Sequence, residues 1–150
     1  MSADAASQVF DSLHPKVQKW IWRQGWNSLR KVQEEAAPTL LSEDSDLIIA
    51  AATAGGKTEA AFLPILSRLL GPDESTECDG LVLYISPLKA LINDQFQRLE
   101  LMTEGIEIPV VPWHGDINRK DKQQFLKKSQ GILLITPESL ESILVNHGHR

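Results

Sequence analysis

The sequence predicts an α/β protein, in which a parallel sheet flanked by helices follows an N-terminal helical segment. Short apolar runs without polar alternation are typical of strands that are buried on both faces. From about residue 46 onward such runs alternate with stretches of helical spacing. Polar motifs containing glycine or proline come directly after these runs, where the carboxyl ends of parallel strands meet and ligands bind.

Helical spacing and apolar runs define the individual elements. Apolar side chains recur at helical spacing after Pro15, whose fixed φ suits a first helical turn. Gly25 interrupts this pattern, and a second helix is predicted from about Leu29 to Leu41, with a bend at Pro38. The predicted strands are Leu47–Ala51, Leu81–Ser86, Ile106–Trp113 and Gly131–Thr136. The helices predicted between and after them are Lys57–Leu70, Leu88–Leu99, Asn118–Lys128 and Pro137–Val145. We therefore divide the chain into a helical segment, 1–41, and an α/β domain, 42–150.

The composition limits the classes of protein to consider. Of the 150 residues, 42% are hydrophobic and 23% are charged, as in ordinary globular domains. The single cysteine, Cys78, excludes an intramolecular disulfide. No stretch has the roughly 18 apolar residues of a membrane span, and the N-terminus does not read as a signal peptide. We expect a cytoplasmic protein without membrane contact. The formal net charge of -5 argues against a broad basic face for nucleic acid, although local backbone contacts remain open.

A phosphate-binding loop is predicted at Ala51–Thr58, which follows an apolar run and opens a helix. Gly55 and Gly56 lack a Cβ, so the backbone can approach an anion closely. Lys57 would reach the β- and γ-phosphates of a nucleotide, and the Thr58 hydroxyl would bind Mg²⁺. The predicted phosphate site is Thr53, Ala54, Gly55, Gly56, Lys57 and Thr58, with Lys57 and Thr58 as the catalytic groups. The alternative is a chance GGKT at a turn, which the flanking apolar strand and helix disfavour.

This loop resembles the A-x-T-G-x-G-K-T form of superfamily 2 DEAD/DEAH-box helicases, with Ala54 where that family usually has Gly. The following TEAAFLPIL is similar to the Lhr-type (large helicase-related) members. The segment Gly25–Gln33, GWNSLRKVQ, resembles the family's Q motif, although Leu29 and Arg30 replace its Pro and Thr. The resemblance implies that the Gln33 amide binds the adenine edge, whose donor and acceptor it complements. We interpret Trp20, Trp22 and Trp26 as core or adenine-pocket walls.

Three further loops resemble nucleic-acid-binding motifs of the same family. They are Ser86–Leu91 (SPLKAL), His114–Asp116 (HGD) and Thr136–Leu140 (TPESL), and each follows a predicted strand. The resemblance implies that these loops hold the sugar-phosphate backbone of one DNA or RNA strand without reading its sequence. Helix N-termini offer free N–H groups for such contacts. The residues implied are Pro87, Lys89, Gly115, Thr136 and Pro137.

The resemblance implies an ATP-dependent helicase with a partial RecA-like ATP-binding domain and with ATP and Mg²⁺ as cofactors. No D-E-x-[DH] sequence occurs in the chain. We therefore expect the hydrolytic carboxylates and a second helicase domain beyond Arg150, and no hydrolysis by residues 1–150 alone. The alternative is a truncated, non-catalytic nucleotide-binding remnant or partner-binding module. A small-molecule P-loop kinase is disfavoured because PLKAL and TPESL have no role there. No histidine pair has metal-ligand spacing, so no metal site besides the Mg²⁺ of Thr58 is expected.

Overall fold

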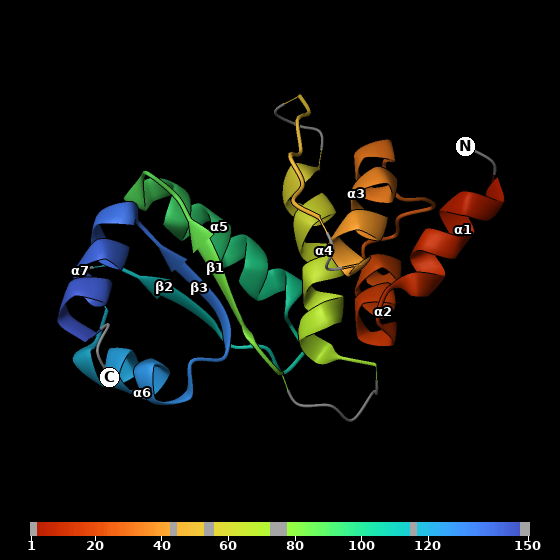
Figure 1. The fold of residues 1–150 in the computed structure, drawn as a ribbon. Helices are drawn as coiled ribbons and strands as arrows, with labels where there is room; N and C mark the ends of the chain where they lie inside the picture. Colours follow the sequence, from red (N-terminus) through yellow and green to blue (C-terminus); the bar gives the residue numbers. More distant parts are fainter. Residues whose placement is uncertain (1–2, 43–44, 53–55, 73–77, 115–116, 148–150) are drawn as a thin grey trace. The chain divides into compact units, whose positions relative to one another are not determined.

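The computed structural model describes residues 3–42, 45–52, 56–72, 78–114 and 117–147, and Figure 1 shows its helices and strands. The helices are α1 (Ala3–Ser12), α2 (Pro15–Arg23), α3 (Lys31–Ser42), α4 (Lys57–Leu70), α5 (Lys89–Met102), α6 (Arg119–Lys128) and α7 (Pro137–His147). The strands are β1 (Leu81–Ile85), β2 (Val110–Trp113) and β3 (Gly131–Ile135). The chain forms two compact units, Met1–Glu77 and Cys78–Arg150. The domain boundary predicted from the sequence, between residues 41 and 42, stays a prediction.

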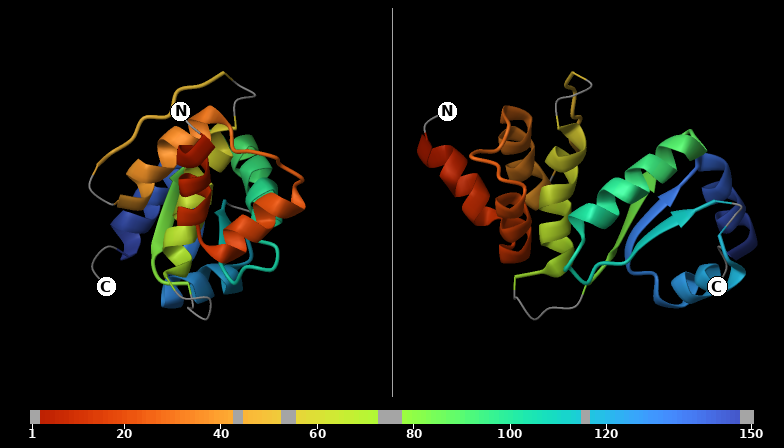
Figure 2. Two further views of the ribbon diagram at one scale, coloured as in Figure 1. Left: turned by 90° about the vertical axis from the view of Figure 1, so that its right-hand side faces the viewer. Right: turned by 180° about the vertical axis from the view of Figure 1, so that it is seen from behind.

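The first unit is helical, and α3 lies alongside α4 in both views (Figures 1 and 2). The Arg68 guanidinium donates from Nη1 to the Leu40 carbonyl at 3.0 Å, which joins α4 to the last turns of α3. The two helices run through Pro38 and Pro64, respectively. Their apolar packing therefore outweighs the loss of one backbone hydrogen bond at each proline.

A buried hydrogen bond joins α2 to α4. His14 is the N-cap of α2, and its Nδ1 accepts from the Lys16 amide at 3.1 Å, while Pro15 occupies the first helical turn. The amide of His14 donates to Ser67 Oγ of α4 at 3.0 Å. Because His14 and Ser67 are both buried, this bond satisfies a donor that water cannot reach.

The second unit contains a three-stranded parallel sheet with the order β1-β3-β2, as the apolar runs predict. All five residues of the central strand β3 are buried. Side chains alternate between the faces of a strand, so Leu133 and Ile135 join Trp113 and Phe125 in one core cluster. Helices cover both faces, with α5 on one and α6 and α7 on the other (Figure 2).

Two of the predicted strands differ in the structure. The strand predicted at Leu47–Ala51 is wrong, since residues 45–52 form neither helix nor strand, and Ile48 is 92% exposed. An apolar run needs a neighbouring strand to accept its ladder hydrogen bonds, and apolar composition alone does not provide one. Strand β2 begins at Val110 rather than Ile106. Pro109 accepts from the Ile132 amide at 2.8 Å but has no N–H with which to continue the ladder.

Candidate functional site

Of the predicted phosphate-site residues, the structure describes Gly56, Lys57 and Thr58, at the start of α4. Thr53, Ala54 and Gly55 lie outside the described residues. Gly56 is the N-cap of α4 in the left-handed conformation, with φ 77° and ψ 31°, which favours glycine. The first intrahelical bond runs from the Ala60 amide to the Gly56 carbonyl at 2.9 Å. The amides of a first helical turn point toward the helix N-terminus, a geometry suited to an anion.

The two residues predicted to act on the triphosphate lie in this first turn. Lys57 is exposed and Thr58 is half-buried. Both are at the start of α4, and buried side chains further along this helix, such as Leu63 and Leu66, pack it into the core of the first unit. A rigid helix start is a suitable base for a cation and a hydroxyl that must meet phosphate and Mg²⁺.

Gln33 lies directly against the end of the loop. A Cβ built on Gly56 would lie 2.8 Å from Gln33 Nε2 and 3.3 Å from Arg30 Cδ. Gln33 is only 3% exposed, so its amide has little room to move away. The structure thus brings together two motifs that lie more than twenty residues apart in the chain. The positive φ at position 56 favours glycine, and a Cβ there would also require the Gln33 amide to shift.

The carbonyl of the same amide fixes its orientation. Gln33 Oε1 accepts from the Arg30 amide at 2.9 Å, which is the glutamine half of a capping box at the start of α3. This bond directs Nε2 toward Gly56 and leaves Oε1 with a second lone pair. The spacing of Arg30 and Gln33 by three residues was visible in the sequence, but the cap was not predicted there. Adenine binding by Gln33 stays a prediction.

A groove of about 750 Å³ adjoins the Q-like segment within the first unit. Its walls are formed by α1, α2 and residues 25–29 and include Phe10, Trp22 and Trp26. Trp26 makes an edge-to-face contact with Trp20, with ring centroids 5.4 Å apart. Trp22 is 75% exposed, so it belongs to the groove wall rather than to the core.

The second unit places the predicted strand-binding loops at one edge of its sheet. Ile85, Ile135 and Trp113 are register partners on the three neighbouring strands, and the chain leaves the sheet directly after each of them. Pro87 and Lys89 follow β1 and are exposed, while His114 follows β2. Gly115 lies outside the described residues. Parallel strands thus bring segments distant in sequence to one edge, as predicted.

The third of these loops is built around a helix cap. Thr136 is half-buried, and Pro137 opens α7 at an exposed position. Thr136 Oγ1 accepts from the Ser139 amide at 3.3 Å and donates to Ser139 Oγ at 3.1 Å. The Thr136 hydroxyl, which is predicted to contact phosphate, therefore directs its proton to the Ser139 hydroxyl. The Ser139 hydroxyl keeps its own proton as a possible donor.

Few other groups suggest chemistry. Burial raises the pKa of the Cys78 thiol and of the Tyr84 phenol, and neither lies among the predicted site residues. Among the residues that the structure describes, no three histidine, cysteine or acidic side chains gather as a metal site would require. Within the same ranges, no helix combines the length and apolar character needed to cross a bilayer.

The fold is that of a RecA-like helicase domain, as two solved structures indicate. The DEAD-box helicase Mss116, solved with ssRNA and UDP-BeF, superimposes with a TM-score of 0.77 over 94% of this chain and 30% of its own, at 24% identity. Helicase Lhr from Mycobacterium smegmatis, solved with ssDNA and AMP-PNP, gives a TM-score of 0.70 over 92% of this chain and 18% of its own, at 27% identity.

Sequence comparison gives the particular family. The DEAD/DEAH box helicase family matches residues 30–150, and the chain belongs to this family. The ATP-dependent helicase Lhr-Core of Saccharolobus solfataricus is 36% identical over 88% of this chain. That of Methanothermobacter thermautotrophicus is 32% identical over 93%. The chain spans 16% and 18% of the lengths of these two relatives, respectively. The predicted membership of the DEAD/DEAH-box helicases, with similarity to Lhr-type proteins, is thereby confirmed.

Proposed function

We propose that this chain supplies the ATP-binding part, and part of the strand-binding surface, of an ATP-dependent helicase that acts on single-stranded DNA or RNA. The observation that carries the proposal is the nearness of the Gln33 amide to Gly56, where an added Cβ would lie 2.8 Å from Nε2. It joins the Q-like motif to the end of the phosphate loop in one site. A nucleotide whose phosphates lie on the α4 N-terminus would have its base on the Gln33 side.

The proposed roles follow from the chemistry of each group. Backbone amides of the first turn of α4 and the Lys57 ammonium would hold the β- and γ-phosphates. The Thr58 hydroxyl would be a ligand of Mg²⁺, which on the bound nucleotide neutralises charge that develops during phosphoryl transfer. The second lone pair of Gln33 Oε1 is the acceptor available for the exocyclic amine of adenine. The groove beside residues 25–29 gives an apolar wall on the same segment.

The proposed strand contacts lie at the sheet edge of the second unit. The N-termini of α5 and α7 follow β1 and β3 directly, and their first-turn amides suit phosphate oxygens. Pro87, Lys89, Gly115, Thr136 and Pro137 are the proposed backbone contacts. Such contacts hold a strand by its phosphates and are insensitive to base sequence. The carboxylates for hydrolysis and a second helicase domain in the same polypeptide are also part of the proposal.

The test is ATP turnover by the natural protein that carries this chain, measured with and without single-stranded DNA and RNA. We expect a strand to stimulate turnover, and Lys57→Ala to lower it by about 100-fold or more because phosphate charge loses a stabilising cation. Lys19→Ala, which removes an exposed lysine of α2, is the matched control and should leave turnover unchanged. Turnover that ignores both kinds of strand would contradict the proposed strand contacts. Unchanged turnover in Lys57→Ala would contradict the assigned phosphate site.

A further inference from the structure

A polar groove lies between α6 and α7, next to the loops that follow β2 and β3. It has a volume of about 250 Å³ and is lined by polar and aromatic side chains of β2, α6, α7 and the residue after β2. These include Trp113, His114, Lys122, Ser139, Ser142 and Asn146. Pockets that enclose drug-sized ligands measure roughly 300–1,000 Å³, so this groove suits one small group rather than a whole nucleotide.

The α7 side of the groove presents hydroxyl protons. Asn146 Nδ2 donates to Ser142 Oγ at 3.3 Å, and Thr136 Oγ1 donates to Ser139 Oγ at 3.1 Å. A hydroxyl oxygen that already accepts a hydrogen bond still has its own proton to donate. Ser139 and Ser142 are one helical turn apart on α7 and line the groove together. The wall that they form therefore favours a ligand with acceptor oxygens.

The α6 side of the groove carries an oriented positive charge. The Lys122 ammonium lies over the Trp113 ring, 5.3 Å from its centroid, and Trp113 is itself buried. A cation–π contact of this kind holds the lysine in place without neutralising it. Helix α6 has five basic residues and one acidic residue, Asp121, in a chain whose formal net charge is -5. The groove is thus beside the most basic helix of an acidic chain.

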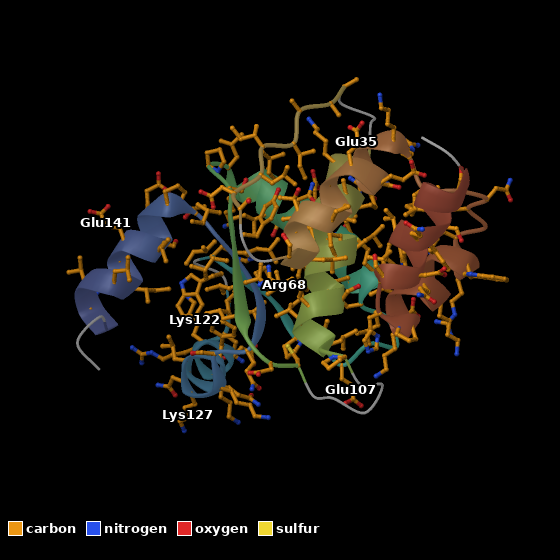
Figure 3. All side chains as sticks on the ribbon, turned by 45° about the vertical axis from the view of Figure 1, so that its right-hand side comes forward. Glu35, Arg68, Glu107, Lys122, Lys127 and Glu141 are labelled. Carbon is orange, nitrogen blue, oxygen red and sulfur yellow. The ribbon has the colours of Figure 1, made fainter. Side chains whose placement is uncertain are left out.

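Acidic side chains near the groove point elsewhere. Glu138 and Glu141 belong to α7, but neither lines the groove, and both are exposed. Figure 3 shows Glu141 on the side of α7 that faces away from Lys122. The same view shows Lys122 and Lys127 on opposite sides of α6. Lys127 is therefore a second positive charge on the same helix that does not reach the groove.

We propose that the α6–α7 groove binds one phosphodiester group of the nucleic-acid strand, with Lys122 as the cation and Ser139 and Ser142 as hydrogen-bond donors. The inference rests on the proposed function and extends it to Lys122 and Ser142, which lie outside the strand-end motifs. His114 directly follows β2, and Ser139 lies in the first turn of α7, so the groove opens beside two of the proposed strand contacts. A strand held by those loops passes the mouth of the groove.

The experiment measures the affinity of the natural protein for a labelled single strand of mixed sequence across a range of salt concentrations. Lys122→Gln should weaken binding about tenfold, as expected for the loss of a hydrogen bond between charged groups. It should also reduce the slope of log affinity against log salt by about 0.7, the value for one lost contact to a single strand. Lys122→Arg should keep most of the affinity and the original slope.

Two further variants separate the groove from general charge. Lys127→Gln removes the same charge from the other side of α6 and should leave both affinity and slope nearly unchanged. Ser142→Ala combined with Asn146→Ala should weaken binding about threefold at constant slope, because neutral donors release no counterions. The melting temperature of each variant verifies that the protein remains folded.

The outcomes distinguish this inference from the function on which it rests. If the unaltered protein binds no strand, the proposed function fails and the groove assignment fails with it. If the unaltered protein binds a strand and Lys122→Gln matches Lys127→Gln in affinity and slope, the groove assignment alone is overturned. A tenfold loss confined to Lys122→Gln, with the reduced slope, supports the groove.

Discussion

At the scale of single residues, the proposed nucleotide site rests on Gly56 and Gln33. The sequence identified them separately, Gly56 through the phosphate loop and Gln33 through the Q-like motif. A Cβ on Gly56 would lie 2.8 Å from Gln33 Nε2, and this close approach depends on how α3 packs against α4. Tertiary packing of this kind has no local sequence signal. The same holds for Lys122, whose position over Trp113 no motif indicated.

A pair of glycine substitutions tests this contact. Gly56 and Gly25 both have positive φ, 77° and 70°, so alanine at either position costs about 1 kcal/mol of backbone strain. A Cβ at Gly25 meets no atom within 4 Å, whereas one at Gly56 meets the buried Gln33 amide. Gly56→Ala should therefore lower the free energy of unfolding by about 2–3 kcal/mol, and Gly25→Ala by only about 1 kcal/mol. Chemical denaturation measures both values, and equal losses would show that Gln33 moves aside without cost.

At the scale of helices and strands, long periodic segments were predicted well. The helix predicted at Lys57–Leu70 agrees with α4 at both ends, because a glycine precedes it and another follows it. The strand predicted at Leu47–Ala51 was wrong because its apolar composition alone does not make a strand. The backbone of a strand needs hydrogen-bond partners on a neighbouring strand, and the local sequence does not specify that neighbour. Pro109 likewise shortened β2 at a residue that cannot donate.

The buried bond between α2 and α4 gives a prediction at this scale. Ser67→Ala removes the acceptor of the His14 amide and leaves that N–H buried without it, so the first unit should lose about 1–3 kcal/mol of stability. Ser42→Ala is the matched control, because the Ser42 hydroxyl is exposed and bonds only within its own helix, to Thr39. It should change stability by less than about 0.5 kcal/mol. The melting temperatures of the two variants give the comparison. Similar decreases in both would show that the His14–Ser67 bond does not stabilise the first unit.

At the scale of the whole molecule, the order of the motifs along the chain was the most useful guide to the family. Each strand-end motif was weak alone, yet β1, β2 and β3 place all three motifs at one sheet edge. Net charge was a poor guide to the local surface charge, because a total of -5 does not reveal that helix α6 has five basic residues. Local charge and the order of motifs therefore describe the surfaces of this chain better than its totals do.

The central claim is that Gln33 and the start of α4 form one adenine-nucleotide site, and the most direct test is equilibrium binding of Mg·ATP and Mg·GTP to the natural protein. We predict that Lys57→Ala weakens both nucleotides alike, because phosphate contacts are common to them. Gln33→Ala should weaken ATP by about tenfold and GTP much less, because only adenine loses its matched amide. An equal loss for both nucleotides in Gln33→Ala, or no loss for either, would contradict the claim.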